Sequence, residues 1–321
     1  MDEIGLDRGR FESATLSGGT GADALDAARA LRAGDAEAGF TISELCLNVG
    51  AVQPERLAEV YDALCEGWLG AAPSAPAIGG DPVPGDLPEG FFPGLWALVD
   101  DPDAGRDPAD ITVRTAALAG MLGDGFRQRV ADMARRYPGV EVAAAQGLPP
   151  RFEIEVLAAC PRDSLGGELN SLVVDKGFDL EVLDRDGLGL SEMPEPLEYL
   201  NIRILQCHDI WHIVAGYETT GLHEVAISGF QMAQFGHQYS SLFLGVVLTK
   251  NAYTMPVAAT GFLLDTILSA YRHGRETPPM LPISWEAIWD RPIEEIRERC
   301  GIQPYDSPYP AGIIEQLRAA G

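Results

Sequence analysis

Residues 197–235 read LEYLNIRILQCHDIWHIVAGYETTGLHEVAISGFQMAQF. Apolar residues recur at helical spacing from Leu197 to Val214, and again from about Leu222 to Phe235, which predicts two helices. Gly216 and the run Thr219-Thr220-Gly221 separate them with residues that interrupt helices. The stretch therefore predicts a helix, a short turn and a second helix.

Several residue types that bind metals gather in this stretch: His208, Asp209, His212 and Glu224. At about 100° per residue, His212 lies about 40° and Asp209 about 100° around the helix from His208, so the three share one face. Glu224 is in the first turn of the next helix, which a short turn can bring back to the first. Two imidazoles and two carboxylates suit Zn, Fe, Mn or Co. We therefore predict that these four residues form a divalent metal site and are its catalytic residues.

Other interpretations of the same residues stay open. His208 and His212 can be buried core histidines with Asp209 as a surface charge. The pattern H-D-x-x-H also resembles the H-E-x-x-H of zinc metalloproteases, in which the acid is a general base. Aspartate is one methylene shorter than glutamate, which disfavours a protease but leaves a metal-dependent hydrolase open. His223 and His237 are better explained as polar helix ends, and Cys207 as a small buried apolar residue.

Composition restricts the partners and the compartment. The 321 residues carry 48 acidic and 23 basic side chains, a formal charge of −25, which phosphate backbones would repel, so we predict no nucleic acid partner. Five widely spaced cysteines without a C-x-x-C pair favour a reducing compartment. The acidic N-terminus does not resemble a secretory signal. These features predict a cytoplasmic protein, and no segment is long and apolar enough to span a bilayer.

The pattern of helices and breaks predicts a mainly α fold. A stretch from Ala71 to Pro93 holds six prolines and four glycines and indicates a linker or an irregular surface arm. We therefore predict an N-terminal helical appendage over residues 1–70, a linker over residues 71–90, and a single helical domain over residues 91–321. The metal site lies in that domain, between its two consecutive helices.

Two later segments are strongly apolar, Leu242–Leu248 and Val257–Leu268. They are typical of core helices, but they can also line an apolar tunnel or lie on a membrane surface, where an acidic protein would need apolar contact. Residues Trp285 to Cys300 predict one amphipathic helix with a Glu/Arg outer face.

With these residues described, the sequence resembles the coenzyme Q biosynthesis protein 4 family. His208, Asp209, His212 and Glu224 match its signature H-D-x-x-H-x(11)-E with the interval intact. The flanking run Ser164-Leu165-Gly166 and the tail from Trp285 to Arg297 are also similar to the family. The resemblance covers roughly residues 91–303, and Gln231 departs from it by standing where an acid is common.

The resemblance implies a mostly helical metal-binding protein of ubiquinone synthesis that acts on a polyprenylated hydroxybenzoate. The implied reaction is loss of the ring C1 carboxyl group, a lyase reaction that is oxidative in some descriptions. Zinc has no accessible redox change, so an oxidative reaction would require iron or manganese. The implied partners are an isoprenoid lipid, other quinone-biosynthesis proteins and the inner face of a membrane, contacted peripherally. The alternative is a metal-stabilised lipid-binding scaffold without chemistry, and the sequence leaves a homodimer open.

Overall fold

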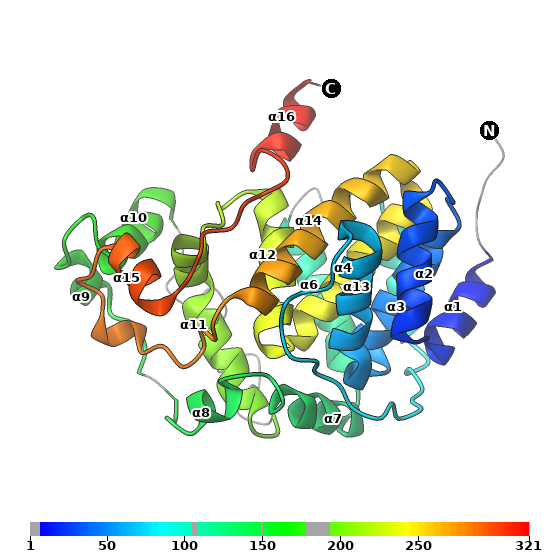
Figure 1. Ribbon diagram of the computed structural model, residues 1–321, viewed down its shortest axis with the longest axis horizontal. Coiled ribbons are helices and arrows are strands. Elements are labelled where there is room, and N and C mark those ends of the chain that lie inside the picture. The colour runs from blue at the N-terminus through cyan, green and yellow to red at the C-terminus, as the bar shows by residue number, and fades with distance from the viewer. Residues whose placement is uncertain (1–6, 105–107, 149, 178–192, 321) are drawn as a thin grey trace.

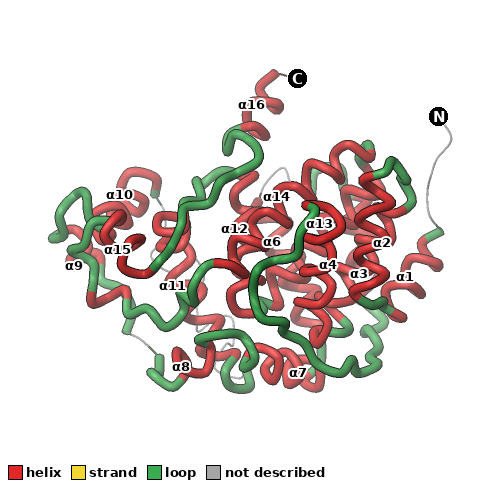
Figure 2. Tube along the Cα trace, in the orientation of Figure 1, coloured by secondary structure: helices red, strands yellow, loops and turns green. Residues whose placement is uncertain are grey.

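The computed structural model describes residues 7–104, 108–148, 150–177 and 193–320. Within these ranges the regular structure is helical, and no strand is drawn in Figure 2. The mainly α fold is therefore confirmed. The elements are α1 (Arg8–Ser17), α2 (Gly21–Arg32), α3 (Ala38–Ala51), η1 (Pro54–Arg56), α4 (Leu57–Leu69), α5 (Phe91–Asp100), α6 (Pro108–Met121), α7 (Asp124–Ala134), α8 (Val140–Ala144), α9 (Ile154–Ala158), α10 (Leu165–Lys176), α11 (Leu197–Ala215), α12 (Gly221–Phe235), α13 (Gln238–Thr254), α14 (Val257–Glu276), η3 (Trp285–Ala287), α15 (Ile293–Cys300) and α16 (Ile313–Ala320).

The helices form an elongated body with the two long apolar helices α13 and α14 inside it (Figure 1). Helices α1 to α4 lie at one end and α9, α10 and α15 at the other, while α16 projects from the side. The most extensive helix contacts join α3 to α13, α12 to α14 and α2 to α4. Buried apolar side chains from α1 through α15 belong to one hydrophobic cluster. The first helices thus share the core that holds the predicted metal-site helices, and the division at residues 70 and 90 stays a prediction.

The proline-rich segment is an irregular arm fixed along the surface. It has no helix between α4 and α5, and its backbone forms hydrogen bonds with side chains of two helices, α7 and α14. Arg275 donates to the Pro76 carbonyl at 2.6 Å and Arg129 donates to the Val83 carbonyl at 3.3 Å. The Glu276 carboxylate accepts from the Ser74 amide at 3.0 Å. These contacts anchor the arm across α7 and α14, because each of these three backbone groups has a charged side chain as its partner.

The C-terminal segment differs from the predicted single helix over Trp285–Cys300. A 3₁₀ turn at Trp285–Ala287 is followed by a break, and α15 starts only at Ile293. Pro292 precedes that start because proline has no N–H to continue a preceding helix and suits the beginning of the next one. The break lets the segment pair with the start of α10, where the Leu165 and Gly166 amides donate to the Arg291 and Trp289 carbonyls.

Side chains from the same segment hold α11 in place. Arg203 of α11 is 3% exposed and forms an ion pair with Glu286 at 2.5 Å. Arg297 of α15 donates to the carbonyls of Ile213 and Val214, which belong to the last turn of α11. A cation there satisfies carbonyls that the helix itself cannot, so the tail contacts the first half and the last turn of the helix that carries the histidine pair.

Among the described helices, none is both long and apolar enough to cross a membrane. The acidic residues 1–6, on which the prediction of a cytoplasmic protein partly depends, lie outside the described residues.

Glu44 on α3 gives a pH-dependent test of this packing. Burial raises its pKa from the ordinary value of 4.5 to about 7, although Arg10 opposes the shift. The folded protein therefore holds this proton more tightly than the unfolded chain does. Burying the ionised carboxylate destabilises the folded protein, and this destabilisation is absent below pH 4.5 and complete above pH 7. The shift corresponds to about 3 kcal/mol, which partial exposure lowers to about 1–2 kcal/mol.

Glu44→Gln is accordingly expected to stabilise the protein by about 1–2 kcal/mol at pH 8 and by nearly nothing at pH 4.5. Denaturant unfolding at both pH values measures the difference. Glu89→Gln, at an exposed position of the surface arm, is the control and should show no such dependence. An equal effect of Glu44→Gln at both pH values would contradict the burial of this carboxyl group.

Candidate metal centre

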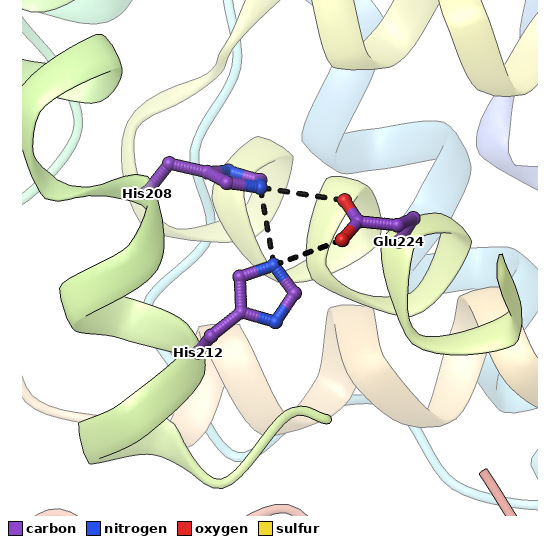
Figure 3. Close-up of side chains that lie close together, drawn as sticks. All are labelled: His208, His212 and Glu224. Carbon is purple, nitrogen blue, oxygen red and sulfur yellow. Dashed lines mark hydrogen bonds and ion pairs between the residues drawn. The ribbon is translucent and has the colours of Figure 1, made fainter. Parts of the chain in front are cut away.

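The predicted helix–turn–helix forms, with α11 ending at Ala215 and α12 starting at Gly221. Gly216 ends α11 in the left-handed conformation, with φ of 80°, which glycine adopts without strain. A Cβ atom there would also lie 2.8 Å from the Pro304 side chain. Thr220 then has extended backbone angles before α12 begins. The turn folds α12 back beside α11, so the first turn of α12 faces the last two turns of α11 (Figure 3).

Three side chains converge in the space between the two helices: His208 and His212 from α11 and Glu224 from α12 (Figure 3). The two Nε2 atoms are 3.1 Å apart. Nε2 of His208 lies 3.3 Å from Oε2 of Glu224, and Nε2 of His212 lies 3.4 Å from Oε1 of the same carboxylate. A tetrahedral zinc ion with bonds of about 2.05 Å separates neighbouring ligand atoms by about 3.3 Å. The two imidazole nitrogens and the carboxylate therefore already have the spacing that one small divalent cation requires.

Backbone and amide contacts orient the two imidazoles. Nδ1 of His212 lies 3.2 Å from the Tyr217 carbonyl oxygen, which can only accept, so His212 carries its proton on Nδ1 and presents a bare Nε2. Nδ1 of His208 lies 2.7 Å from the Gln231 side-chain amide. A carbonyl acceptor at the outer ring nitrogen, as at His212, is typical of metal-binding histidines. The converging side chains therefore have hydrogen-bond partners that fix the orientation of both rings.

The electrostatics of the cluster favour an ionised carboxylate. Burial would raise the pKa of Glu224, but hydrogen bonds and charges of both imidazoles outweigh burial and hold this pKa far below its ordinary value. Burial would likewise lower the pKa of His208, yet the hydrogen bond and charge of Glu224 raise it above the ordinary histidine value. An ionised carboxylate beside two imidazole nitrogens favours a cation, so a divalent metal ion would be electrostatically stabilised at this position.

The other predicted residues lie differently. No ligand atom of Asp209 is in the group of mutually close atoms, so the structure brings together three of the four predicted ligands. Burial raises the pKa of Asp209, against the lowering effect of the two histidines. His223 accepts the Glu218 amide at Nδ1, as expected for a polar helix end. Cys207 is fully buried, and burial raises the pKa of its thiol to about 12, so it is a small core residue.

The supporting residues Tyr217 and Gln231 were not predicted. For Tyr217 no sequence signal exists, because it contributes a backbone carbonyl. Gln231 had a signal, since it follows Glu224 by seven residues and such residues share one face of a helix. The same reasoning applied to α12 would have placed both side chains toward α11.

The cluster opens onto a cavity of about 1310 Å³, which is larger than the roughly 300–1,000 Å³ typical of small-molecule sites. His208, Glu224 and Gln231 line it at one wall. Its other walls come from α6, α7, α13 and α14 and are largely apolar, with contributions from Ile111, Phe126, Val130, Phe243, Val247 and Leu263. A polar cluster that can hold a metal therefore faces a large and mostly apolar cavity.

The two apolar segments contribute side chains both to the hydrophobic core and to the wall of this cavity. In α13, Leu242, Leu244 and Leu248 are fully buried in the core, whereas Phe243 and Val247 line the cavity. The segments are core helices on one side and a cavity wall on the other.

Comparison with known proteins places this region in a family. A model described as "Coenzyme Q (ubiquinone) biosynthesis protein Coq4" matches residues 150–306. The ubiquinone biosynthesis protein COQ4 homologue of Drosophila ananassae, described as mitochondrial, is 25% identical over 196 residues, 58% of this chain and 69% of that protein. The Drosophila melanogaster homologue is 26% identical over 154 residues, 47% of this chain and 54% of that protein. The chain thus spans between about half and about two thirds of these relatives.

A crystal structure of a protein assigned to ubiquinone biosynthesis, from Nostoc punctiforme PCC 73102, aligns with a TM-score of 0.48 and 23% identity, covering 66% of this chain and 97% of that one. This level of similarity is too low to bear on fold or function. The family model spans all of α11 and α12, including the three converging side chains. Through residues 150–306, about half of its length, the chain matches the coenzyme Q (ubiquinone) biosynthesis protein Coq4 family.

Proposed function

We propose that this protein acts in ubiquinone biosynthesis as a metal-dependent lyase that removes the C1 carboxyl group of a polyprenylated hydroxybenzoate. The family assignment supports the pathway. The observation that carries the reaction class is the His208–His212–Glu224 triangle, two of whose members, His208 and Glu224, line a largely apolar cavity. A prenyl tail requires such a cavity, and a polar aromatic head would lie at the metal.

The number of ligands favours an enzyme over the metal-stabilised scaffold. Structural zinc sites have four protein ligands, whereas catalytic sites have three and keep a position for water or substrate. Among the described residues, the group of close ligand atoms has three members. Two of them, His208 and Glu224, line the cavity, so the remaining coordination positions would face a bound molecule there.

The residues divide the work as follows. His208, His212 and Glu224 would hold the ion, and the Tyr217 carbonyl fixes the tautomer of His212. The ion, when bound, would supply positive charge that stabilises the electron pair left on the ring when the carboxyl group leaves as carbon dioxide and a proton replaces it at C1. Phe243 and Val247 would pack against the isoprenoid tail, and the surrounding apolar wall would exclude water from the ring.

The partners follow from the same cavity. Val113 and Met255 line it and are 64% and 55% exposed, which would let a lipid enter from a membrane surface without crossing water. We propose peripheral contact with the inner face of a membrane at these residues, and association there with other quinone-biosynthesis proteins.

A direct assay tests the reaction. The purified protein is loaded with Zn²⁺, Mn²⁺ or Fe²⁺ and given a prenylated 4-hydroxybenzoate in air, and released carbon dioxide is measured. His212→Ala is expected to reduce the rate at least about 100-fold, because the loss of one of three ligands disrupts the site. Glu218→Ala changes an exposed residue of the adjoining turn and should leave the rate unchanged.

The outcome separates the candidate functions. Metal binding that depends on His212 without carbon dioxide release under any metal would reject the lyase and leave the scaffold. Hydrolysis of ester or phosphoester substrates that requires Asp209 would instead assign a hydrolase.

A further inference from the structure

A line of polar side chains runs from the metal centre along the cavity wall. Nδ1 of His208 meets the Gln231 amide at 2.7 Å. The other atom of that amide, Oε1, lies 3.5 Å from the Ser240 hydroxyl. Ser240 in turn lies 2.8 Å from Nδ1 of His237. All four residues line the cavity, and the line ends at the His237 ring.

The position of each proton along this line determines which group donates and which accepts in every hydrogen bond. As placed, the Gln231 amide nitrogen donates to His208 Nδ1, so His208 carries its proton on Nε2. That proton can be donated to the bare Nε2 of His212, 3.1 Å away. Ser240 donates to Gln231 Oε1, so Nδ1 of His237 must donate to Ser240. Nε2 of His237 is then a bare acceptor.

Metal binding by His208 would exchange donor and acceptor in each of these hydrogen bonds. A metal ligand must offer a lone pair, so His208 would move its proton from Nε2 to Nδ1. Gln231 would then have to present its oxygen to His208, and rotating the amide by 180° exchanges oxygen and nitrogen in place. Its nitrogen would donate to Ser240, and Ser240 would donate to Nδ1 of His237. Nε2 of His237 would carry a proton and become a donor.

We propose that Gln231 and Ser240 couple the metal centre to His237, so that metal binding converts His237 from a hydrogen-bond acceptor into a donor aimed at a ligand oxygen in the cavity. This inference rests on the proposed metal site. It assigns to His237 the role of a hydrogen-bond donor that recognises a phenol or carboxylate oxygen of the bound aromatic head, and to Ser240 and Gln231 the role of positioning residues.

The surroundings of His237 suit that role. Burial lowers the pKa of His237 to about 3, with a smaller contribution from His208, so the ring is neutral and its direction depends on the tautomer alone. Phe235 and Tyr239 pack near the ring. Within the described residues the structure assigns no hydrogen bond to its Nε2 atom. A neutral donor in a largely apolar wall binds a ligand oxygen more strongly than it would in water.

Nuclear magnetic resonance of ¹⁵N-histidine-labelled protein tests the coupling without any activity measurement. The protein has five histidines, and His237→Gln identifies the His237 signals. On addition of Zn²⁺, which is diamagnetic, we expect His208 and His212 to show coordination through Nε2. The proton of His237 should move from Nδ1 to Nε2 at the same zinc concentration.

Two other results overturn the proposal and are distinguishable. Zinc that changes His208 and His212 while His237 keeps its tautomer would reject the coupling and leave the proposed function intact. No change at any of the three histidines would reject the metal site, and with it both proposals.

Two variants interrupt the line at defined points. Ser240→Ala removes the link to His237 and should abolish the tautomer change while zinc affinity stays within about threefold. Ser241→Ala is its matched control, since Ser241 is equally buried and its hydroxyl has no partner among the described residues, and it should behave as wild type. Gln231→Glu can accept from His208 but cannot donate to Ser240, so it should keep or increase zinc affinity and leave His237 an acceptor.

Ligand binding gives the second readout. With zinc bound, Ser240→Ala and Gln231→Glu should each bind prenylated 4-hydroxybenzoate about tenfold more weakly in calorimetry, the loss expected for one hydrogen bond to a charged group. Unchanged affinity in both variants would mean that His237 does not contact the ligand oxygen.

Discussion

Glu224→Gln is expected to lower the affinity for a divalent metal ion at least about 100-fold, the largest effect of any single change at this site. The substitution keeps the shape of the side chain but removes the negative charge that lies 3.3 Å and 3.4 Å from the two Nε2 atoms. Changing a residue that merely supports a metal ligand costs 10–100-fold in affinity, and Glu224 would be a ligand itself.

Titration of the metal-free protein with Zn²⁺ and Mn²⁺, together with elemental analysis, measures this effect. Thermal unfolding gives an independent value, because a metal at 100 times its dissociation constant stabilises the folded protein by about 2.7 kcal/mol. Glu224→Gln should lose this stabilisation, whereas Glu218→Gln in the adjoining turn should keep it. Wild-type affinity in Glu224→Gln would remove the carboxylate from the metal centre and leave two histidines, too few for the proposed site.

Gly50→Val is expected to destabilise the protein by about 3 kcal/mol or more and to lower Tm by about 5 °C or more. Gly50 lies where α3 crosses α13, and a Cβ atom there would be 2.9 Å from the backbone nitrogen and Cα of Leu242. On the facing helix, a Cβ at Gly245 would be 3.0 Å from Cα of Leu47. Backbone atoms cannot turn away as a side chain can, so the two helices would have to separate.

Denaturant unfolding of Gly50→Val, with Gly50→Ala as a milder change of the same sign, measures this effect. Gly125→Ala is the matched control, because Gly125 is also in a helix but a Cβ there meets no atom within 4 Å. That control should be more stable than wild type by about 0.5–1 kcal/mol. If Gly50→Val unfolded like wild type, α3 and α13 would not cross at this point, and the N-terminal helices would be separable from the rest.

The sequence pattern was sufficient to predict the features that depend on local helix geometry. A helix places residues four apart on one face, so the spacing of His208 and His212 already determined that their rings meet. Glycine and threonine at 216 and 219–221 determined the break between α11 and α12. Because that break is short, the sequence could also bring Glu224 to the pair.

Features that depend on how helices pack needed the tertiary structure. Asp209 lies about 100° around the helix from His208. At that angle Asp209 can be either a metal ligand or only a neighbour of the site, and the position of α12 decides which. Similarly, Gly50 and Gly245 are isolated glycines in the sequence. Only the close crossing of α3 and α13 explains why a side chain would not fit at either position. The break before α15 was missed because the apolar spacing continues across Pro292.

The cavity and the line of hydrogen bonds from His208 to His237 likewise depend on the tertiary structure. Ser240 and His237 belong to the start of α13 and Gln231 to α12, and their contacts depend on the bend between these helices at Gly236. Sequence alone therefore determined which residues can bind a metal, because one helix and one turn control their spacing. Only the packing of α6, α7, α13 and α14 around α11 and α12 decided what faces the candidate metal site, because a cavity wall is made by side chains that are distant in the chain.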